Sequence, residues 1–112
     1  MKKDPTVFLK HILECINLIK EYVKDKTEKE FSEDIELQDA VIRRLEIIGE
    51  ATRNFPDEFR NQYSEIAWKQ ILATRNILIH HYFGIDLNLI WSIIKNDLPS
   101  LKKQITQMLA AD

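Results

Sequence analysis

The sequence predicts an all-α fold, a single domain of four or five helices packed as an up-and-down bundle. Apolar residues recur every three or four positions along most of the chain, which is the spacing of one face of an α-helix. The 112 residues include only two glycines and three prolines, too few to supply the turns of a many-stranded β domain. No internal repeat or alternating strand pattern occurs, so residues 1–112 are expected to form one domain.

The first half of the chain predicts two long helices. Asp4 followed by Pro5 is a typical helix start, an N-cap and then proline at the first helical position. An apolar stripe follows to about residue 24, and residues 24–34 are expected to form a linker that can include a helical turn. A second stripe from Leu37 to Thr52 predicts the next helix. Residues 54–56 end it, because the residue before Pro56 disfavours the α conformation.

The second half predicts a short helix and two longer ones. Pro56 is expected to open a short helix to residue 63, and Ser64 or Glu65 to open a third long helix that ends at Gly84. Asp86 is expected to cap the last helix, which Pro99 should kink or restart. The expected buried stripe of the third long helix comprises Trp68, Ile71, Leu72, Ile79 and Tyr82.

Composition and charge exclude some classes of function. The formal net charge is −2, which argues against a surface that coats nucleic acid broadly and leaves room for a local positive patch. No apolar run approaches the roughly 18 residues of a membrane span. The single cysteine, Cys15, lies on an apolar stripe and is expected to be a core residue. These features predict a cytoplasmic protein without a membrane association or a cofactor.

The third long helix carries side chains that a plain bundle would not need. Arg75 falls on the apolar stripe, where it must extend to solvent, pair with a carboxylate or face a second subunit. Asn76 and His80 are four residues apart and could hydrogen-bond. His81 and Tyr82 follow directly, so five polar or titratable side chains gather within eight residues.

The spacing of Arg75 and His80 favours a dimer. At 100° per residue, side chains five positions apart point about 140° apart on an ideal helix. They cannot converge on one small group unless the helix frays, the side chains reach around it, or a two-fold dimer brings two copies of the segment together. We favour the dimer, because the apolar surroundings of the segment also require burial.

These residue types suit metal-free cleavage of RNA, in which the 2′-OH attacks the adjacent phosphate. Histidine moves a proton near neutral pH, and arginine holds a phosphate and stabilises charge that develops on it. Asparagine can orient the imidazole. The alternatives remain open: a solvated arginine, two polar histidines at a helix end, or a zinc site on His80 and His81, which lacks further ligands.

The segment Arg75–Tyr82 resembles the R-x4-H-x-Y motif of HepT-type HEPN proteins, the toxin half of HEPN/MNT toxin–antitoxin pairs. Residues 40–51 are similar to the family's second-helix signature, as are Trp68 ahead of the motif and the Gly84-Ile85-Asp86 run after it. The similarity covers about residues 4–109. Residues 72–74 depart from the family, which commonly has Gly-Met before the arginine; no catalytic group is lost.

The resemblance implies an all-α homodimer with metal-independent endoribonuclease activity at the dimer interface, acting on RNA such as tRNA or mRNA. By this analogy His80 is the catalytic histidine, Arg75 handles the phosphate and Asn76 supports them. Tyr82 matches the tyrosine that a partner MNT-type nucleotidyltransferase modifies with AMP to silence the toxin, in a type VII-like pair. The alternative is a non-enzymatic helical module that dimerises or binds a partner. Weakly favoured RNA-binding residues are Arg43, Arg44, Arg53 and Lys69.

Overall fold

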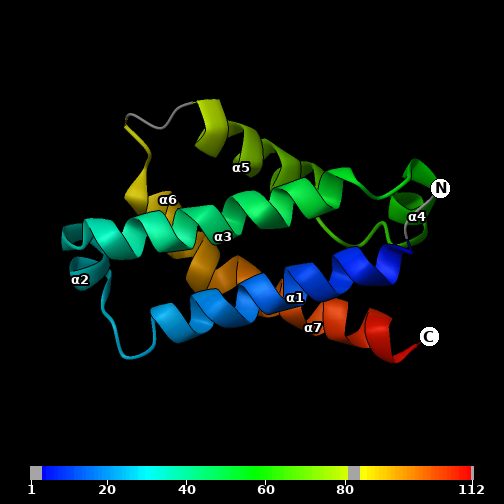
Figure 1. Ribbon diagram of the computed structural model, residues 1–112, viewed down its shortest axis with the longest axis horizontal. Helices are drawn as coiled ribbons and strands as arrows, with labels where there is room; N and C mark the ends of the chain where they lie inside the picture. The colour runs from blue at the N-terminus through cyan, green and yellow to red at the C-terminus, as the bar shows by residue number, and fades with distance from the viewer. Residues whose placement is uncertain (1–3, 81–83, 112) are drawn as a thin grey trace.

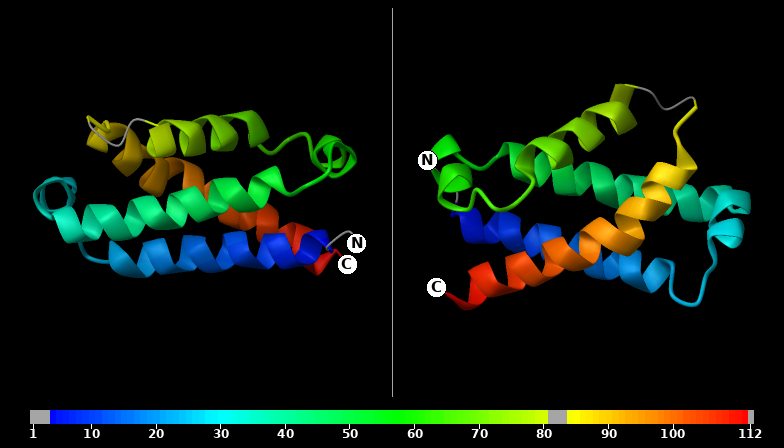
Figure 2. Two further views of the ribbon diagram at one scale, coloured as in Figure 1. Left: turned by 45° about the horizontal axis from the view of Figure 1, so that its top comes forward. Right: turned by 180° about the vertical axis from the view of Figure 1, so that it is seen from behind.

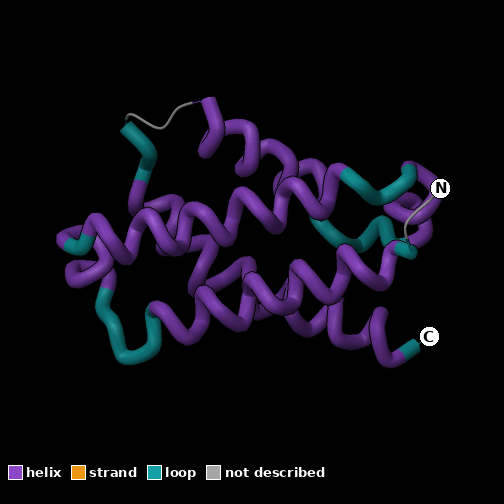
Figure 3. Tube along the Cα trace, viewed as in Figure 1, coloured by secondary structure: helices purple, strands orange, loops and turns teal. Residues whose placement is uncertain are grey.

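The computed structural model describes residues 4–80 and 84–111, and every element in these ranges is helical. Figure 1 shows long helical rows, with a short helix at either end of the molecule. The last row runs without interruption through α6, a π-helical segment and α7 (Figure 3). In chain order the elements are α1 (Pro5–Tyr22), α2 (Glu28–Glu33), α3 (Ile35–Arg53), α4 (Asp57–Gln62), α5 (Trp68–His80), α6 (Leu87–Ser92), η1 (Ile93–Asp97) and α7 (Leu98–Ala110).

Helix α3 is the centre of the arrangement. It packs against α1 on one side and α5 on the other, and α7 crosses behind α1 (Figures 1 and 2). The buried apolar side chains form one cluster, in which Ile12, Val41 and Ile105 are almost inaccessible to solvent. The prediction of an all-helical bundle is therefore confirmed.

The segment expected to be a linker contains a short helix. Thr27 and Glu30 form a capping box: the Thr27 hydroxyl accepts from the Glu30 N–H at 3.1 Å, and the Glu30 carboxylate accepts from the Thr27 N–H at 3.0 Å. The Phe31 ring is fully buried, with its centroid 5.4 Å from that of Trp91. Polar capping and one buried ring thus form a helix where the sequence shows mostly charge.

The predicted helix starts are confirmed at Asp4 and Asp86, whose carboxylates accept backbone N–H groups of the first turn. The start expected at Ser64 or Glu65 is wrong, because α5 begins at Trp68. The Trp68 indole N–H donates to the carbonyls of Arg60 and Tyr63, both at 3.1 Å. These bonds hold residues 63–67 as a turn instead of a first helical turn.

Pro99 restarts the last helical row, as predicted. Proline has no N–H to donate to the carbonyl four residues earlier, so the regular α pattern cannot pass through it. The chain widens into the π-helical turn η1, where the Leu98 N–H donates to the Ile93 carbonyl five residues back. Helix α7 then continues to Ala110 with Leu98, Leu101, Ile105 and Met108 buried.

Along residues 4–80 and 84–111, none of the helices combines the length and the apolar character that crossing a bilayer requires.

Matched substitutions in α1 test the position of the core. Ile12 is fully buried, whereas Val7 on the same helix is 43% exposed. Ile12→Ala should lower the free energy of unfolding by about 2–5 kcal/mol, because it leaves a cavity between α1 and its neighbours. Val7→Ala should change it by less than about 1 kcal/mol. Urea titration followed by circular dichroism measures both, and equal losses would contradict the assigned packing.

Candidate active site

Helices α3 and α5 approach each other closely where Gly49 faces Arg75. A β-carbon built on Gly49 would lie 2.3 Å from Cβ and 2.6 Å from Cγ of Arg75, far inside van der Waals contact. The α-carbon of Gly49 is therefore the surface on which the aliphatic part of Arg75 packs. The contact fixes where the Arg75 side chain leaves its helix.

The guanidinium of Arg75 is held at both terminal nitrogens. Nη2 donates to Glu50 Oε2 at 3.0 Å, and Nη1 donates to Asn76 Oδ1 at 2.9 Å. The Arg75 side chain is 16% exposed and that of Glu50 is 53% exposed, so the ion pair lies at the edge of the buried region. Of the three outcomes predicted for an arginine on this stripe, the structure shows pairing with a carboxylate.

The same geometry leaves part of the guanidinium available. An arginine carries five N–H groups, and the two bonds use one on each terminal nitrogen. Within the described residues a second N–H therefore remains on both Nη1 and Nη2, and a guanidinium can use two such N–H groups to bind a phosphate in a two-pronged contact. Nε is buried and has no hydrogen-bond partner among the described residues.

His80 is the last residue of α5 and is exposed to solvent. Within residues 4–80 and 84–111 no hydrogen bond joins it to Asn76, whose side-chain oxygen accepts from Arg75 Nη1. The predicted orienting bond from Asn76 to His80 is therefore wrong in this structure. His81 and Tyr82 lie outside the described residues.

The predicted buried stripe of this helix needs correction. Only Trp68 and Leu78 are buried on α5, and Leu78 was not part of the stripe. Ile71, Leu72 and Ile79 are half-buried, and Tyr82 lies outside the described residues. Since α5 packs chiefly on α3, its buried line runs through Trp68, Ile71, Arg75 and Leu78. Arg75 thus lies on the packed face through its stem and reaches the edge with its charged end.

Two further sequence expectations are confirmed. Cys15 is a core residue with 3% exposure, and burial raises the pKa of its thiol above the ordinary value. That change favours the unreactive neutral thiol at physiological pH. Trp68 is buried in the core, with its ring centroid 5.4 Å from that of Phe55.

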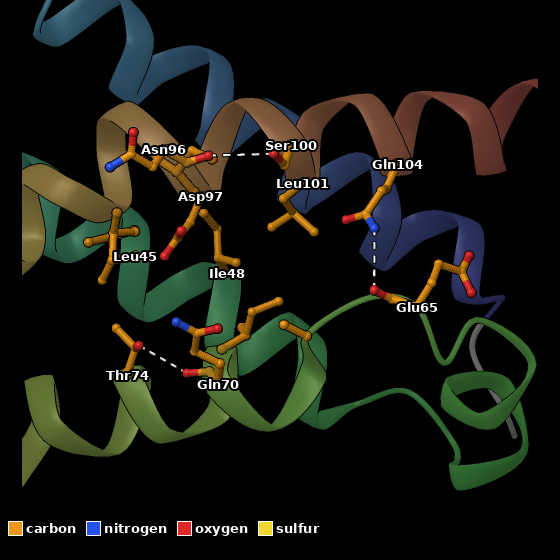
Figure 4. Close-up of a pocket in the computed structure, with 14 residues that line it drawn as sticks. Leu45, Ile48, Glu65, Gln70, Thr74, Asn96, Asp97, Ser100, Leu101 and Gln104 are labelled. Atoms are coloured by element: carbon orange, nitrogen blue, oxygen red, sulfur yellow. Dashed lines mark hydrogen bonds between the residues drawn. The ribbon is translucent and has the colours of Figure 1, made fainter.

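A groove of about 270 Å³ separates α5 from the last helical row (Figure 4). Its floor includes Leu45, Ile48 and Leu101, and Gln104 reaches across one end to donate to the Glu65 carbonyl at 3.4 Å. Neither Arg75 nor His80 lines this groove, so the groove is separate from the arginine site. Its charged lining residues are Glu65 and Asp97, and the Glu65 carboxylate points away from the groove (Figure 4).

The surface beside the motif is partly apolar. Ile77 and Leu89 are each 42% exposed and line a shallow hollow between α5 and α6, together with Thr74 and Ile85. Within residues 4–80 and 84–111, no cluster of three or more His, Cys, Asp or Glu side chains is placed to hold a metal ion.

Comparison with known proteins identifies the family. Residues 12–108 match the family described as Ribonuclease HepT-like. The chain belongs to the HepT-like ribonuclease family. It is an RNA-cleaving enzyme by family, and the matched residues include the arginine held against Gly49.

Several relatives extend the comparison. The chain is 54% identical over 97% of its length to a Methanocaldococcus jannaschii protein named for gamma-glutamylcyclotransferase and RNase, and it spans 49% of that relative. It is 46% identical over 93% of its length to another RNase-named protein of that organism, covering 95% of it. A Thermococcus cleftensis protein named "Probable ribonuclease HepT" is 41% identical, with 96% of this chain and 98% of the relative covered. No solved structure gives a significant match to this chain.

Sequence reasoning assigned no role in the site to Gly49 or Glu50. Both lie 25 or 26 residues before Arg75, so no local spacing connects them to it. A glycine inside a long helix indicates a close approach of another backbone or side chain, and this observation could have pointed to Gly49. Both residues belong to the segment 40–51 that resembles the family's second-helix signature, but the local spacing gives Glu50 no pairing role among the exposed carboxylates of α3.

The Gly49 contact yields a test in which two effects oppose each other. At an open helical position, Gly→Ala stabilises by about 1 kcal/mol through helix propensity. Gly49→Ala should instead destabilise by about 1–3 kcal/mol, because the new methyl group would overlap Arg75 and push α5 from α3. Chemical denaturation measures the sign, with Arg43→Ala on the exposed face of α3 as the control. A stabilised Gly49→Ala variant would refute the close approach.

Proposed function

We propose that this HepT-like ribonuclease is a metal-independent endoribonuclease and the toxin of a toxin–antitoxin pair. In the proposed reaction the 2′-oxygen of RNA bonds to the adjacent phosphorus while the bond from phosphorus to the 5′-oxygen breaks. His80 takes the proton of the 2′-OH, and a second imidazole returns a proton to the departing 5′-oxygen. Arg75 stabilises the charge that develops on the phosphate.

The observation that carries the proposal is the restraint of Arg75. Its stem packs on Gly49, and its terminal nitrogens donate to Glu50 and Asn76, which leaves one further N–H on each without a partner among residues 4–80 and 84–111. A pre-positioned donor pair stabilises a transition state without reorganising during the reaction. We assign Arg75 and His80 as catalytic residues, and Asn76 as a supporting residue that positions the guanidinium.

A homodimer would complete the site. His80 and Arg75 diverge along α5, so one chain presents them about 140° apart on an ideal helix. A two-fold axis near the end of α5 would place His80 of one copy beside Arg75 of the other and would supply both imidazoles. The exposed Ile77 and Leu89 at the adjoining hollow favour this surface as the interface, since they would be buried by the second copy.

Control by a nucleotidyltransferase forms the second part of the proposal. Tyr82 follows His80 by two residues, so AMP attached to its hydroxyl would add a bulky phosphate beside the histidine. The added negative charge would repel an RNA phosphate and block access to the imidazole. An RNA substrate, a cognate nucleotidyltransferase and a lone cysteine in the reduced state all fit the cytoplasm.

Cleavage of RNA in excess EDTA tests the catalytic assignment. Wild-type protein without an adduct should cleave RNA at an unchanged rate with the chelator present. His80→Ala and Arg75→Ala should each lower the rate at least about 100-fold, the usual contribution of a catalytic acid–base or charge-stabilising group. His11→Ala is the matched control, because His11 is an exposed histidine on α1.

Full activity of His80→Ala would show that the catalytic assignment is wrong. Loss of wild-type activity in EDTA would contradict metal independence. Absence of cleavage by every variant, with tight partner binding that persists in His80→Ala, would favour the non-enzymatic binding module.

Co-expression with the cognate nucleotidyltransferase tests the regulatory assignment. Intact-mass spectrometry should show wild-type protein heavier by one or more AMP units, with Tyr82→Phe unmodified. Tyr63→Phe on the distant turn before α5 should be modified like the wild type. Unmodified wild-type protein under these conditions, or an adduct retained by Tyr82→Phe, would contradict the assignment of Tyr82.

A further inference from the structure

A groove rimmed by lysines lies on the side of η1 and α7 away from α5. It has a volume of about 390 Å³ and runs between the C-terminal half of α1 and the last helical row. Its floor is apolar and includes Ile19 and Leu98. We call it the lysine groove, after the four lysines that line it: Lys20, Lys24, Lys95 and Lys102.

The lysine groove concentrates positive charge in a chain whose net charge is −2. Asp25 is its one acidic lining residue. The ion pairs found within the described ranges are all made by arginines, so no described carboxylate lies within 4.0 Å of these four ammonium groups. Lys95 is instead placed with Nζ 4.9 Å from the centre of the Trp91 ring. The groove therefore carries four lysines and one aspartate around an apolar floor, an excess of positive charge.

An acidic projection with an exposed apolar side chain occurs at the junction of α2 and α3. Ile35 is 72% exposed, whereas the other large exposed apolar residues of the described chain are at most 43% exposed. Glu33, Asp34 and Glu36 flank it, and all three are exposed. The Asp34 carboxylate caps α3 through the Leu37 N–H at 3.0 Å, whereas Glu33 and Glu36 form no described ion pair. We call residues 33–36 the acidic knob.

The lysine groove and the acidic knob are complementary in both charge and polarity. One is a hollow with an apolar floor and four lysines, and the other is an exposed apolar side chain in a surface region that carries Glu30, Glu33, Asp34 and Glu36 beside a single lysine, Lys26. The groove includes residues of the turn that follows α1, and the acidic knob joins α2 to α3, so both lie toward the end of the molecule where α1 leads into α2 (Figures 1 and 2). Two complementary surfaces that are neighbours on one chain can meet their counterparts around a single two-fold axis.

We propose that the acidic knob of one copy of this chain inserts into the lysine groove of a second copy, and the reverse. Ile35 would contact the apolar floor while Glu33 and Glu36 pair with the surrounding lysines. This interface is separate from the surface beside α5. Copies that are joined through the α5 surface could therefore assemble further through the knob and the groove. RNA would satisfy the lysines, but it would leave both the apolar floor and the exposed Ile35 without a partner.

Charge reversal in two variants tests the pairing. Sedimentation velocity at low salt should show that Lys20→Glu/Lys102→Glu and Glu33→Lys/Glu36→Lys each weaken self-association at least about tenfold, because like charges now meet. An equimolar mixture of the two variants should restore it, since each knob then faces a groove of opposite charge. Lys10→Glu/Lys103→Glu is the matched control, with the same helices and the same charge change outside the groove.

A second variant removes the apolar contact alone. Ile35→Ser should weaken association while Val7→Ser leaves it unchanged, and circular dichroism should show both to be folded. Unchanged sedimentation of the reversed and Ile35→Ser variants would overturn the proposal. If Lys20→Glu/Lys102→Glu still self-associates but no longer binds RNA, the proposal is also overturned, and the groove is assigned to RNA. RNA cleavage by Ile35→Ser should equal that of the wild type, which separates this interface from the catalytic proposal.

Discussion

The contact between Gly49 and Arg75 is the constraint on which the candidate site depends. An arginine on the packed face of a helix would ordinarily separate two helices, because its stem is bulky and its charge requires a partner. The missing side chain of Gly49 provides the space for the stem, and Glu50, the next residue, provides the carboxylate. The two neighbouring residues of α3 thereby allow α5 to pack closely and still present a charged group at its edge.

Helix α3 therefore has two roles, and a different face of the helix serves each of them. Its buried residues, among them Val41, Leu45 and Ile48, support the core between α1 and α5. Glu50 and Arg53 lie toward solvent, and the Glu50 carboxylate pairs with both Arg53 and Arg75. Because α5 is attached mainly through α3, the position of the arginine is set by this one helix pair.

Charge is divided across the molecule in a way that the net charge of −2 conceals. The last helical row separates a groove whose charged lining residues are Glu65 and Asp97 from a groove with four lysines. Lys95 and Asp97 both belong to η1, yet they line opposite sides of the row. The π-helical turn before Pro99 therefore lies between the two charged grooves.

The sequence by itself determined the helical class, the caps at Asp4 and Asp86 and the restart at Pro99, since these depend on local periodicity and hydrogen-bonding chemistry. It also placed Cys15 in the core and Arg75 on a packed face. Only the tertiary structure decided which carboxylate pairs with Arg75, why Leu78 is buried in place of Ile79, and why Phe31 makes a helix of a charged segment. Each of these depends on a neighbour distant in the chain, and the spacing of nearby residues carries no information about such a neighbour.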